Sequence, residues 1–313
     1  MNAEQLPTVF LMGPTASGKT DLAVQLVQCL DCEIVSVDSA MVYRQMDIGT
    51  AKPGEEVLRK APHRLIDIRD PAESYSAGEF RRDALAEIDA IRGAGRIPLL
   101  VGGTMLYFHA LEHGLAELPP AAPDIREDIE QRAAEEGWGS MHGELARIDP
   151  ETARRIHPKD PQRIQRALEV YYASGETMSE WIGRQHPRPA PGPLLKIAFA
   201  DIERAMLHER IAQRFESMMH SGFVAEVARL KARGDLDPSM SSIKAVGYRQ
   251  IWSALDGEYS MDEGVRRGVV ATRRLAKRQF TWLRAQKGAI SVNPLETGIV
   301  ARITDLVSRV VRG

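Results

Sequence analysis

Residues 13–20 combine glycines, a lysine and hydroxyl side chains at a spacing that suits phosphate chemistry. The stretch fits G-x-x-x-x-G-K-[ST], directly after an apolar run and directly before a helical pattern. Glycines let backbone N–H groups face an anion at a helix N-terminus, while Lys19 reaches the outer phosphate and the Thr20 hydroxyl ligates Mg²⁺. We predict that a diphosphate or triphosphate binds here. The predicted phosphate-binding residues are Gly13, Pro14, Thr15, Ala16, Ser17, Gly18, Lys19 and Thr20, with Thr20 on the metal.

A carboxylate follows the second predicted strand. Asp38 comes directly after residues 34–37, at the carboxyl end of a parallel strand, where open α/β sheets bind their ligands. Taken alone, these residues leave three roles open for Asp38: it holds Mg²⁺ through water, it acts as a base toward an acceptor, or it caps a helix. The loop likewise leaves open nucleotide hydrolysis, phosphoryl transfer and the departure of a whole diphosphate.

The elements that position these groups alternate along the chain. Short β-branched runs are followed by longer helical patterns, which is typical of a parallel sheet flanked by helices. We predict an α/β fold with a P-loop NTPase-like core. The predicted strands are 8–12, 33–37, 64–68, 97–101 and 196–200, and the predicted helices include 20–30, 80–92, 203–220 and 264–287.

The strand pattern is interrupted between residues 101 and 196. Proline-rich stretches at 119–123 and 186–193 bound this interval and suit stiff connections. We predict an inserted all-helical domain at 118–193, within a core formed by 1–117 and 194–313 that ends in C-terminal helices. The chain shows no internal repeat.

Composition and charge narrow the class of protein. The chain has 313 residues, of which 43% are hydrophobic and 27% charged, which excludes disordered and fibrous classes. Its net charge of −2 conceals a basic segment at 264–287 without any acidic residue. On a helix, the cations of this segment cover about half of the circumference and leave the opposite side to Ala271, Leu275 and Trp282. Such a stripe indicates a polyanionic partner, and its members are Arg266, Arg267, Arg273, Arg274, Lys277, Arg278 and Arg284.

Neither a signal peptide nor a membrane span is visible in the sequence. Cys29 and Cys32 have the C-x-x-C spacing of a redox pair or of half a zinc site, but no second ligand pair follows. We expect two reduced thiols that pack in the fold. We also expect a cytoplasmic protein that is a monomer by default and requires no protein partner.

Several motifs, in order along the whole chain, resemble the bacterial tRNA dimethylallyltransferases, also called tRNA isopentenyltransferases. They are residues 13–20, 38–53, 75–78, 102–108, 162–170, 245–250 and 272–279. One position departs from the family pattern, because Lys159 stands where an asparagine is usual between Pro158 and Asp160. This change puts in doubt only the local contact of that amide.

The resemblance implies a specific reaction. Such enzymes transfer a dimethylallyl group from dimethylallyl diphosphate to the exocyclic amine of the adenosine 3′-adjacent to the anticodon, and release diphosphate. Their tRNAs read codons that begin with U. The resemblance also implies Mg²⁺ as cofactor, a channel through the protein, and an insertion that grips the anticodon stem-loop.

The resemblance assigns roles to particular residues. Asp38 would accept the proton of the amine, because a weakly acidic amine needs base assistance during bond formation. Lys19 and Thr20 would hold the diphosphate with Arg210 or Arg214, and Thr104 would stand near the flipped base. Tyr43, Tyr107, Phe108 and Tyr248 could stack on bases, but aromatic side chains beside apolar neighbours are more often part of the core, so none is assigned to stacking. The predicted tRNA-binding residues are Asp38, Ser39, Ala40, Met41, Thr104, Arg126, Gln162, Arg163, Arg166, Lys244, Gly247, Tyr248, Arg249, Arg273, Arg274 and Arg278.

Three other functions compete with this interpretation. A P-loop small-molecule kinase would use Lys19, Thr20 and the acidic strand end, but it leaves the basic segment unexplained. An isopentenyltransferase acting on free adenine nucleotides would need no RNA surface. A non-catalytic RNA-binding module would leave the intact phosphate loop without a purpose.

Overall fold

The computed structural model describes residues 6–185 and 189–312. Contacts between Cα atoms divide the chain into two compact units. The core unit comprises Met1–Glu112 and Ala190–Gly313, and the insertion unit comprises His113–Pro189. These bounds differ by four or five residues from the predicted ones, 118 and 193.

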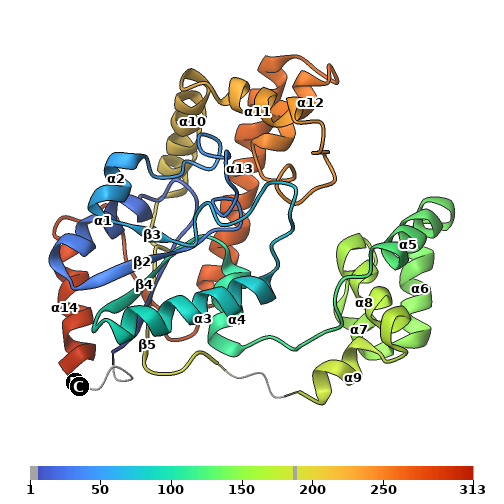
Figure 1. The fold of residues 1–313 in the computed structure, drawn as a ribbon, viewed down its shortest axis with the longest axis horizontal. Coiled ribbons are helices and arrows are strands. Elements are labelled where there is room, and N and C mark those ends of the chain that lie inside the picture. Colours follow the sequence, from blue (N-terminus) through green and yellow to red (C-terminus); the bar gives the residue numbers. More distant parts are fainter. Residues whose placement is uncertain (1–5, 186–188, 313) are drawn as a thin grey trace. The chain divides into compact units, whose positions relative to one another are not determined.

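The core unit is built on a parallel six-stranded sheet with the order β3-β2-β4-β1-β5-β6 (Figure 1). Each strand of this sheet runs parallel to its neighbours, and β1 lies between β4 and β5 in the middle. The predicted α/β fold with a parallel sheet is therefore confirmed. The strands are β1 (Thr8–Met12), β2 (Cys32–Val37), β3 (His63–Arg64), β4 (Ile97–Gly102), β5 (Leu194–Ala198) and β6 (Ile290–Ser291).

Side chains of the central strands alternate between two hydrophobic cores, as the period of a β-strand requires. In β1, Phe10 and Met12 point into one core, where α3 supplies Phe80 and Ile88. Val9 and Leu11 point into the other core, which α1 and α14 cover. Because both faces are covered, the strands are apolar throughout, and only their ends are free for polar chemistry.

The helices of the core unit follow the predicted pattern with shifts of a few residues at their ends. A capping box at Ser76 and Glu79 starts α3, and Ser260 caps α13. At the top of Figure 1, α10–α13 gather on one side of the sheet. The helices are α1 (Lys19–Cys29), α2 (Glu55–Lys60), α3 (Ala77–Gly93), α4 (Met105–His113), α10 (Arg204–His220), α11 (Phe223–Ala232), α12 (Tyr248–Leu255), α13 (Met261–Arg284) and α14 (Ile299–Arg312).

Three strand predictions need correction. The third strand covers only His63–Arg64, because Leu65 and Asp67 have φ values of 61° and 55° and turn the chain out of the sheet. The fifth strand begins two residues earlier than expected, at Leu194. The sixth, Ile290–Ser291, was missed because two residues carry no periodic signal.

Among its described residues, the insertion unit forms helices joined by loops and contains no strand, and it has its own small hydrophobic core. Pro123 and Pro161 stand in the first turns of their helices, where a missing N–H costs nothing. The proline stretch at 119–123 therefore also starts a helix, and part of the stretch at 186–193 lies outside the described residues. The helices are α5 (Pro123–Glu136), α6 (Trp138–Ile148), α7 (Pro150–Arg155), α8 (Pro161–Ser174) and α9 (Met178–Gly183).

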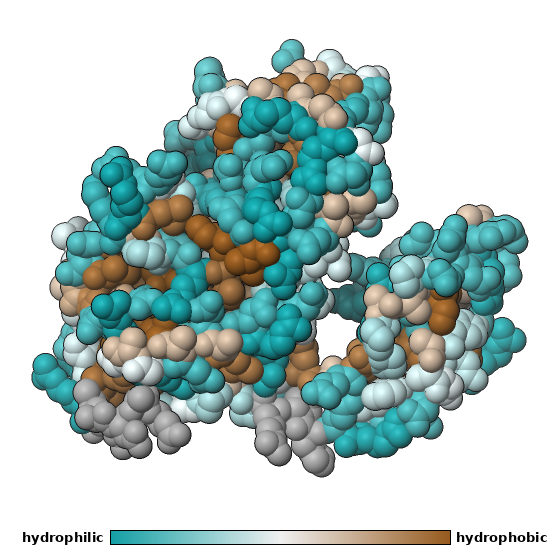
Figure 2. Space-filling model, viewed as in Figure 1, coloured by the Kyte–Doolittle hydropathy of each residue, from teal (hydrophilic) through white to brown (hydrophobic). Residues whose placement is uncertain are grey.

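The surface has the composition of an ordinary protein exterior. On the face drawn in Figure 2, hydrophilic residues predominate in both units, and hydrophobic residues form scattered patches. Among the described residues, no helix combines the length and the hydropathy that crossing a membrane requires.

Candidate active site at the carboxyl edge of the sheet

Three loops meet where the adjacent strands β1, β4 and β2 end. Backbone hydrogen bonds join them: Gly13 donates to the Gly102 carbonyl at 3.2 Å, and Thr104 donates to the Val37 carbonyl at 3.2 Å. Gly102 has no room for a side chain, because an added Cβ would lie 2.0 Å from the Val37 oxygen. The phosphate loop at 13–20 is therefore held against the loop after Asp38, as strand-end geometry requires.

The phosphate loop turns through left-handed backbone conformations at Ala16 (φ 62°) and Gly18 (φ 89°) immediately before α1. This turn directs the free N–H groups of the first helical turn toward one point. Ser17 is fully buried, and its hydroxyl has no hydrogen-bond partner among the described residues. A buried hydroxyl without a partner is costly unless a ligand satisfies it, so this loop suits an anion that accepts from it.

Three cationic side chains surround this loop. Burial and the positive charge of Arg214 lower the pKa of the Lys19 ammonium to about 7, although the Asp38 carboxylate acts in the opposite direction. Burial likewise lowers the pKa of the Arg214 guanidinium, which donates to the Thr50 carbonyl at 3.1 Å. An Arg210 nitrogen lies 3.4 Å from the position that a Cβ on Gly18 would take. Such mutual repulsion between half-buried cations favours an anion that offsets it.

Both predicted arginines therefore belong to the site, but they differ in their own contacts. Arg214 is anchored on the backbone of the loop that follows Asp38. The Arg210 guanidinium has no side-chain or backbone acceptor among the described residues. It is therefore the freer of the two to bind a ligand phosphate. Lys19 donates to the Pro14 carbonyl at 2.8 Å, a contact that a ligand phosphate can replace.

The two carboxylate oxygens of Asp38 differ in their hydrogen bonds. Its Oδ1 accepts from the N–H groups of Ala40 at 2.8 Å and Met41 at 3.2 Å, and this turn fixes the carboxylate in place. No such bond is made by Oδ2 within the described residues. The capping role and the base role are thus compatible, because one oxygen holds the geometry and the other stays available to accept a proton.

Thr104 joins the turn after β4 to the loop after β2. Its Oγ1 accepts from the Ser39 N–H at 3.1 Å and lies 3.5 Å from the Ser39 hydroxyl. The predicted residues Asp38, Ser39 and Thr104 therefore stand together beside the phosphate loop.

The donor set suits a magnesium ion carried by a phosphorylated ligand. No group of three or more histidine, cysteine or acidic side chains that could hold a metal occurs among the residues with described coordinates. The Thr20 hydroxyl makes no hydrogen bond in the part of the chain that is described, and Asp38 supplies a carboxylate nearby. Mg²⁺ is commonly held by one or two protein oxygens, substrate phosphates and water, so these residues fit it.

A buried carboxylate that the sequence reasoning missed supports the loop after Asp38. Glu226 on α11 is 1% exposed and accepts from the N–H groups of Asp47, Ile48 and Gly49 at 2.8 to 3.1 Å. The Tyr248 hydroxyl also donates to it at 2.6 Å. Nothing in the local pattern of α11 distinguishes Glu226 from a surface glutamate, since its partners lie far away in the sequence.

This network corrects one predicted RNA contact. The Tyr248 ring is 0% exposed and packs edge-on against Phe223. Tyr43, Tyr107 and Phe108 are buried as well, as expected for aromatic side chains with apolar neighbours. Tyr248 therefore supports the site from inside and is not an RNA contact in this structure. Gly247 before it is also buried, with φ of 97°.

The basic helix α13 is less uniform than the sequence suggests. Arg266 and Arg267 both pair with Glu263, which lies one turn upstream of them and directly precedes the acid-free segment. Arg273 is partly buried, and its Nη2 donates to the His208 carbonyl at 3.4 Å. Exposed side chains without a side-chain partner in the described structure are Arg274, Lys277 and Arg278.

The apolar side of α13 was also predicted incorrectly. Trp282 is 38% exposed, whereas Gly268, Ala276, Gln279 and Leu283 are buried. Helix α10 sets this face, because a Cβ on Gly268 would lie 2.3 Å from the Phe215 ring. A line of small residues lets α13 approach closely, so the buried face is chosen by shape rather than by hydropathy.

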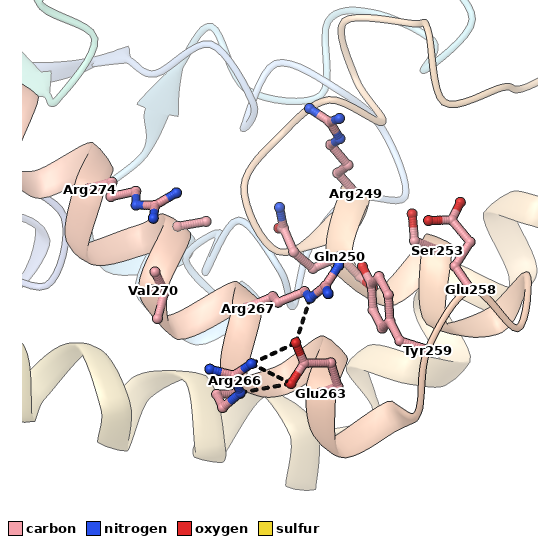
Figure 3. A pocket seen from close by; sticks show the side chains of 11 residues that line it. Arg249, Gln250, Ser253, Glu258, Tyr259, Glu263, Arg266, Arg267, Val270 and Arg274 are labelled. Carbon is pink, nitrogen blue, oxygen red and sulfur yellow. Dashed lines mark hydrogen bonds and ion pairs between the residues drawn. The ribbon is translucent and has the colours of Figure 1, made fainter.

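A pocket of about 460 Å³ opens between α12 and α13, beside the arginine cluster (Figure 3). The Arg267 guanidinium lies over the Tyr259 ring, 4.2 Å from its centre, and dashed lines in the figure mark the pairs with Glu263. Arg249 and Arg274 border the same pocket. Both are exposed and have no side-chain partner among the residues described, and Lys244 is exposed in the preceding loop.

In the insertion unit, the predicted RNA contacts fall into two groups. Arg126 and Arg166 pair with Glu169, which is 0% exposed and also accepts from the Ala122 N–H. Although burial favours its neutral form, hydrogen bonds from both arginines lower the pKa of Glu169. Gln162 and Arg163 are exposed on α8, and Arg163 pairs with Asp160. The first group is thus braced by a buried carboxylate, whereas the second is exposed at the start of α8.

The cysteines are free thiols, as expected, but only one packs. Cys32 is buried at the start of β2, and burial raises the pKa of its thiol to about 12. Cys29 is exposed at the end of α1, which contradicts the expectation of two packing thiols.

Known proteins place this fold and site in a class. The phosphate loop, the cations around it and the parallel sheet define an α/β phosphate-loop protein with a second, helical unit. Residues 41–286 match the family model described as IPP transferase. A tRNA dimethylallyltransferase of Thioalkalivibrio sulfidiphilus (strain HL-EbGR7) is 56% identical over 301 residues, covering 95% of this chain and 94% of that protein. The chain belongs to the IPP transferase family.

Solved structures agree with this assignment. A tRNA isopentenylpyrophosphate transferase from Bacillus halodurans matches with a TM-score of 0.73 and 34% identity, covering 98% of this chain and 97% of that one. A tRNA delta(2)-isopentenylpyrophosphate transferase from Staphylococcus epidermidis matches with a TM-score of 0.68 and 30% identity, covering 97% of this chain and 99% of that one. A eukaryotic dimethylallyltransferase acting on tRNA shares the fold, with a TM-score of 0.79 at 24% identity over 97% and 80% of the two chains. These comparisons confirm the family resemblance found in the sequence and the prenyltransferase class. They do not support the alternative of a P-loop small-molecule kinase.

Proposed function

We propose that this protein transfers a dimethylallyl group from dimethylallyl diphosphate to the exocyclic amine of an adenosine in tRNA and releases diphosphate. The observation that carries the proposal is the group of Lys19, Arg210 and Arg214 at the phosphate loop, with Asp38 at the end of the neighbouring strand β2. Membership of the IPP transferase family and relatives named for this reaction support it. The adenosine is the one 3′-adjacent to the anticodon, in tRNAs that read codons beginning with U.

The donor binds through its diphosphate. The N–H groups of the loop, the buried Ser17 hydroxyl, Lys19 and Arg210 surround it, and Arg214 adds a fixed charge. These groups favour the diphosphate more strongly as negative charge develops on its leaving oxygen, so they stabilise the transition state. Thr20 would help to hold a Mg²⁺ ion, which would supply further neutralisation of negative charge.

The acceptor amine then attacks the first carbon of the dimethylallyl group. As the new carbon–nitrogen bond forms, the carbon–oxygen bond breaks and its electron pair leaves with the diphosphate. Asp38 accepts the proton of the amine on Oδ2, while Oδ1 stays bound to the Ala40 and Met41 amides. The Thr104 hydroxyl, held against Ser39, stands where it can orient the base.

The tRNA anticodon stem-loop is the macromolecular partner. We assign its contacts to the exposed side chains of the loop after β2, of helix α13 with the pocket beside it, and of the insertion unit. The exposed ones are Ser39, Gln162, Arg163, Lys244, Arg249, Arg274 and Arg278; the half-buried Ala40 and Met41 join them, and Glu169 braces Arg126 and Arg166. The proposal includes a cytoplasmic monomer that works without a protein partner.

A competition between acceptors tests the function. The protein is incubated with labelled dimethylallyl diphosphate, Mg²⁺ and an equimolar mixture of tRNA and AMP, with ATP and tRNA in a parallel reaction. Label in tRNA at the adenosine beside the anticodon, with release of diphosphate, is the expected result. Label in AMP alone, or phosphate transfer from ATP, would refute the proposal.

A further inference from the structure

Helix α13 contributes one buried polar side chain to the edge of the sheet. Gln279 is 8% exposed, and both ends of its amide bind backbone groups of the phosphate site. Its Oε1 accepts from the Thr15 N–H at 2.9 Å, and its Nε2 donates to the Gly103 carbonyl at 2.8 Å. The other buried residues on this face of α13 are small or apolar, so Gln279 has a polar task that packing does not explain.

The two backbone groups that Gln279 joins belong to the donor side and to the acceptor side. Thr15 is part of the diphosphate loop, and Gly103 precedes Thr104, which holds the loop after Asp38. The fit is close, since a Cβ on Gly103 would lie 2.5 Å from the Gln279 amide nitrogen and 3.1 Å from the Gly13 carbonyl. A shorter or differently shaped side chain would therefore let the two loops change their spacing.

The two hydrogen bonds of Gln279 also leave the ligand-binding amides of the phosphate loop free. Gln279 uses the N–H of Thr15, whereas the N–H groups of the first turn of α1, at Lys19 and Thr20, have no intrahelical acceptor. The adjacent residue Arg278 is exposed, about 100° away from Gln279 around the axis of α13. One rigid helix thus faces solvent with cations and faces the site with the Gln279 amide.

We propose that Gln279 is a positioning residue for the transfer reaction. It fixes the spacing between the diphosphate loop at Thr15 and the acceptor turn at Gly103 and Thr104, and it fastens both to the RNA-binding helix α13. This inference rests on the proposed function. Its consequence is kinetic: the residue places donor and acceptor in reacting distance and contributes little to the affinity for either one.

The test compares Gln279→Met, which keeps the length and loses both hydrogen bonds, with Gln279→Glu, which keeps an acceptor for Thr15 and loses the donor to Gly103. Gln25→Met on the exposed side of α1 is the matched control. We expect kcat per titrated active site to fall about 10- to 100-fold in Gln279→Met, less in Gln279→Glu, and not at all in the control. KM for both substrates should change less than about 3-fold.

A double-variant cycle separates positioning from a general loss of structure. Thr104→Val is made in the wild-type and Gln279→Met backgrounds, and we expect it to lower kcat much less in the second background, because Thr104 is then already displaced. Additive losses, or an unchanged kcat in folded Gln279→Met or Gln279→Glu, would overturn the role of Gln279. An inactive wild type would instead refute the proposed function, so the two failures are distinguishable.

Discussion

Lys19 allows a quantitative test of the electrostatics of the phosphate loop. Burial and Arg214 lower the pKa of its ammonium to about 7, against the opposing effect of Asp38. A bound diphosphate favours the charged lysine and raises the pKa again. Binding therefore takes up a proton above pH 7, and the affinity for the donor falls as the pH rises through this value.

The expected magnitude follows from the protonated fraction of Lys19. With a pKa of about 7, this fraction falls about 80-fold between pH 7.5 and 9.5, and the donor affinity should fall with it. A lysine of ordinary pKa would lose only roughly a tenth of its protonated fraction over the same range. The assay is titration calorimetry with the sulfur-bridged analogue of dimethylallyl diphosphate at constant excess Mg²⁺, in buffers of different ionisation heat. Lys19→Arg, which stays charged, is the control and should show a nearly flat affinity.

The same reasoning predicts the stability of the ligand-free protein. Because the folded-state pKa of Lys19 is lowered, the charged form destabilises the fold fully below pH 7, and this cost disappears as the pH rises toward 10.5. Lys19→Met should therefore raise Tm at pH 6.5 and abolish the increase in Tm that the donor analogue produces in the wild type. A parallel loss of donor affinity in wild type and Lys19→Arg, together with a lower Tm for Lys19→Met, would refute this reasoning.

Three further predictions address the other parts of the site. Asp38→Asn should lower the single-turnover rate by about 10²–10⁴-fold at saturating tRNA and donor, and a collapse of donor affinity with normal chemistry would exclude Asp38 as the base. Replacing Arg274, Lys277 and Arg278 by Gln should make the dependence of log affinity for tRNA on log salt concentration less steep, by roughly 0.7–0.9 for each RNA phosphate that these cations neutralise. The affinity for the donor is the control and should not change. An unchanged slope would show that α13 is not part of the RNA interface. Glu226→Ala should lower the free energy of unfolding by about 3 kcal/mol in urea titrations, because three partly buried N–H groups and the buried Tyr248 hydroxyl lose their acceptor. A change below about 0.5 kcal/mol would show that the loop does not depend on Glu226.

Much of the fold could be predicted because its determinants are local in sequence. The run at Thr8–Met12 and the loop after it define a strand, a turn and a helix within a single short stretch. Strand ends then bring Asp38 and Thr104 beside that loop, since adjacent parallel strands end at the same edge. Short elements such as Ile290–Ser291 could not be found in this way, because their pairing depends on partners that are distant along the chain.

The supporting residues of the site escaped prediction for the same physical reason. Glu226 binds backbone groups that lie 177 to 179 positions away in the sequence, and Gln279 binds two that lie 176 and 264 positions away. Sequence periodicity carries no information on such distant contacts. The orientation of α13 was missed because close packing against Phe215 requires glycine at position 268, a residue that hydropathy alone does not rank as part of a buried face. Tyr248 stands in a motif that resembles an RNA-binding one, yet its ring fills the space beside Glu226.

These supports explain how the site tolerates its own unfavourable groups. Without a ligand, the loop places a buried hydroxyl without a partner at Ser17, a left-handed turn at Ala16, and the repelling cations Lys19 and Arg214 in one small volume of the described structure. Each of these is destabilising in isolation, and together they would let the loop relax into a shape that no longer fits a diphosphate. Gln279 opposes that relaxation from α13, and a carboxylate on α11 does the same for the loop after Asp38. Because the constraints come from different elements, we expect the site to keep its ligand-ready shape, and in the proposed function the diphosphate would offset unfavourable interactions that already exist when it binds.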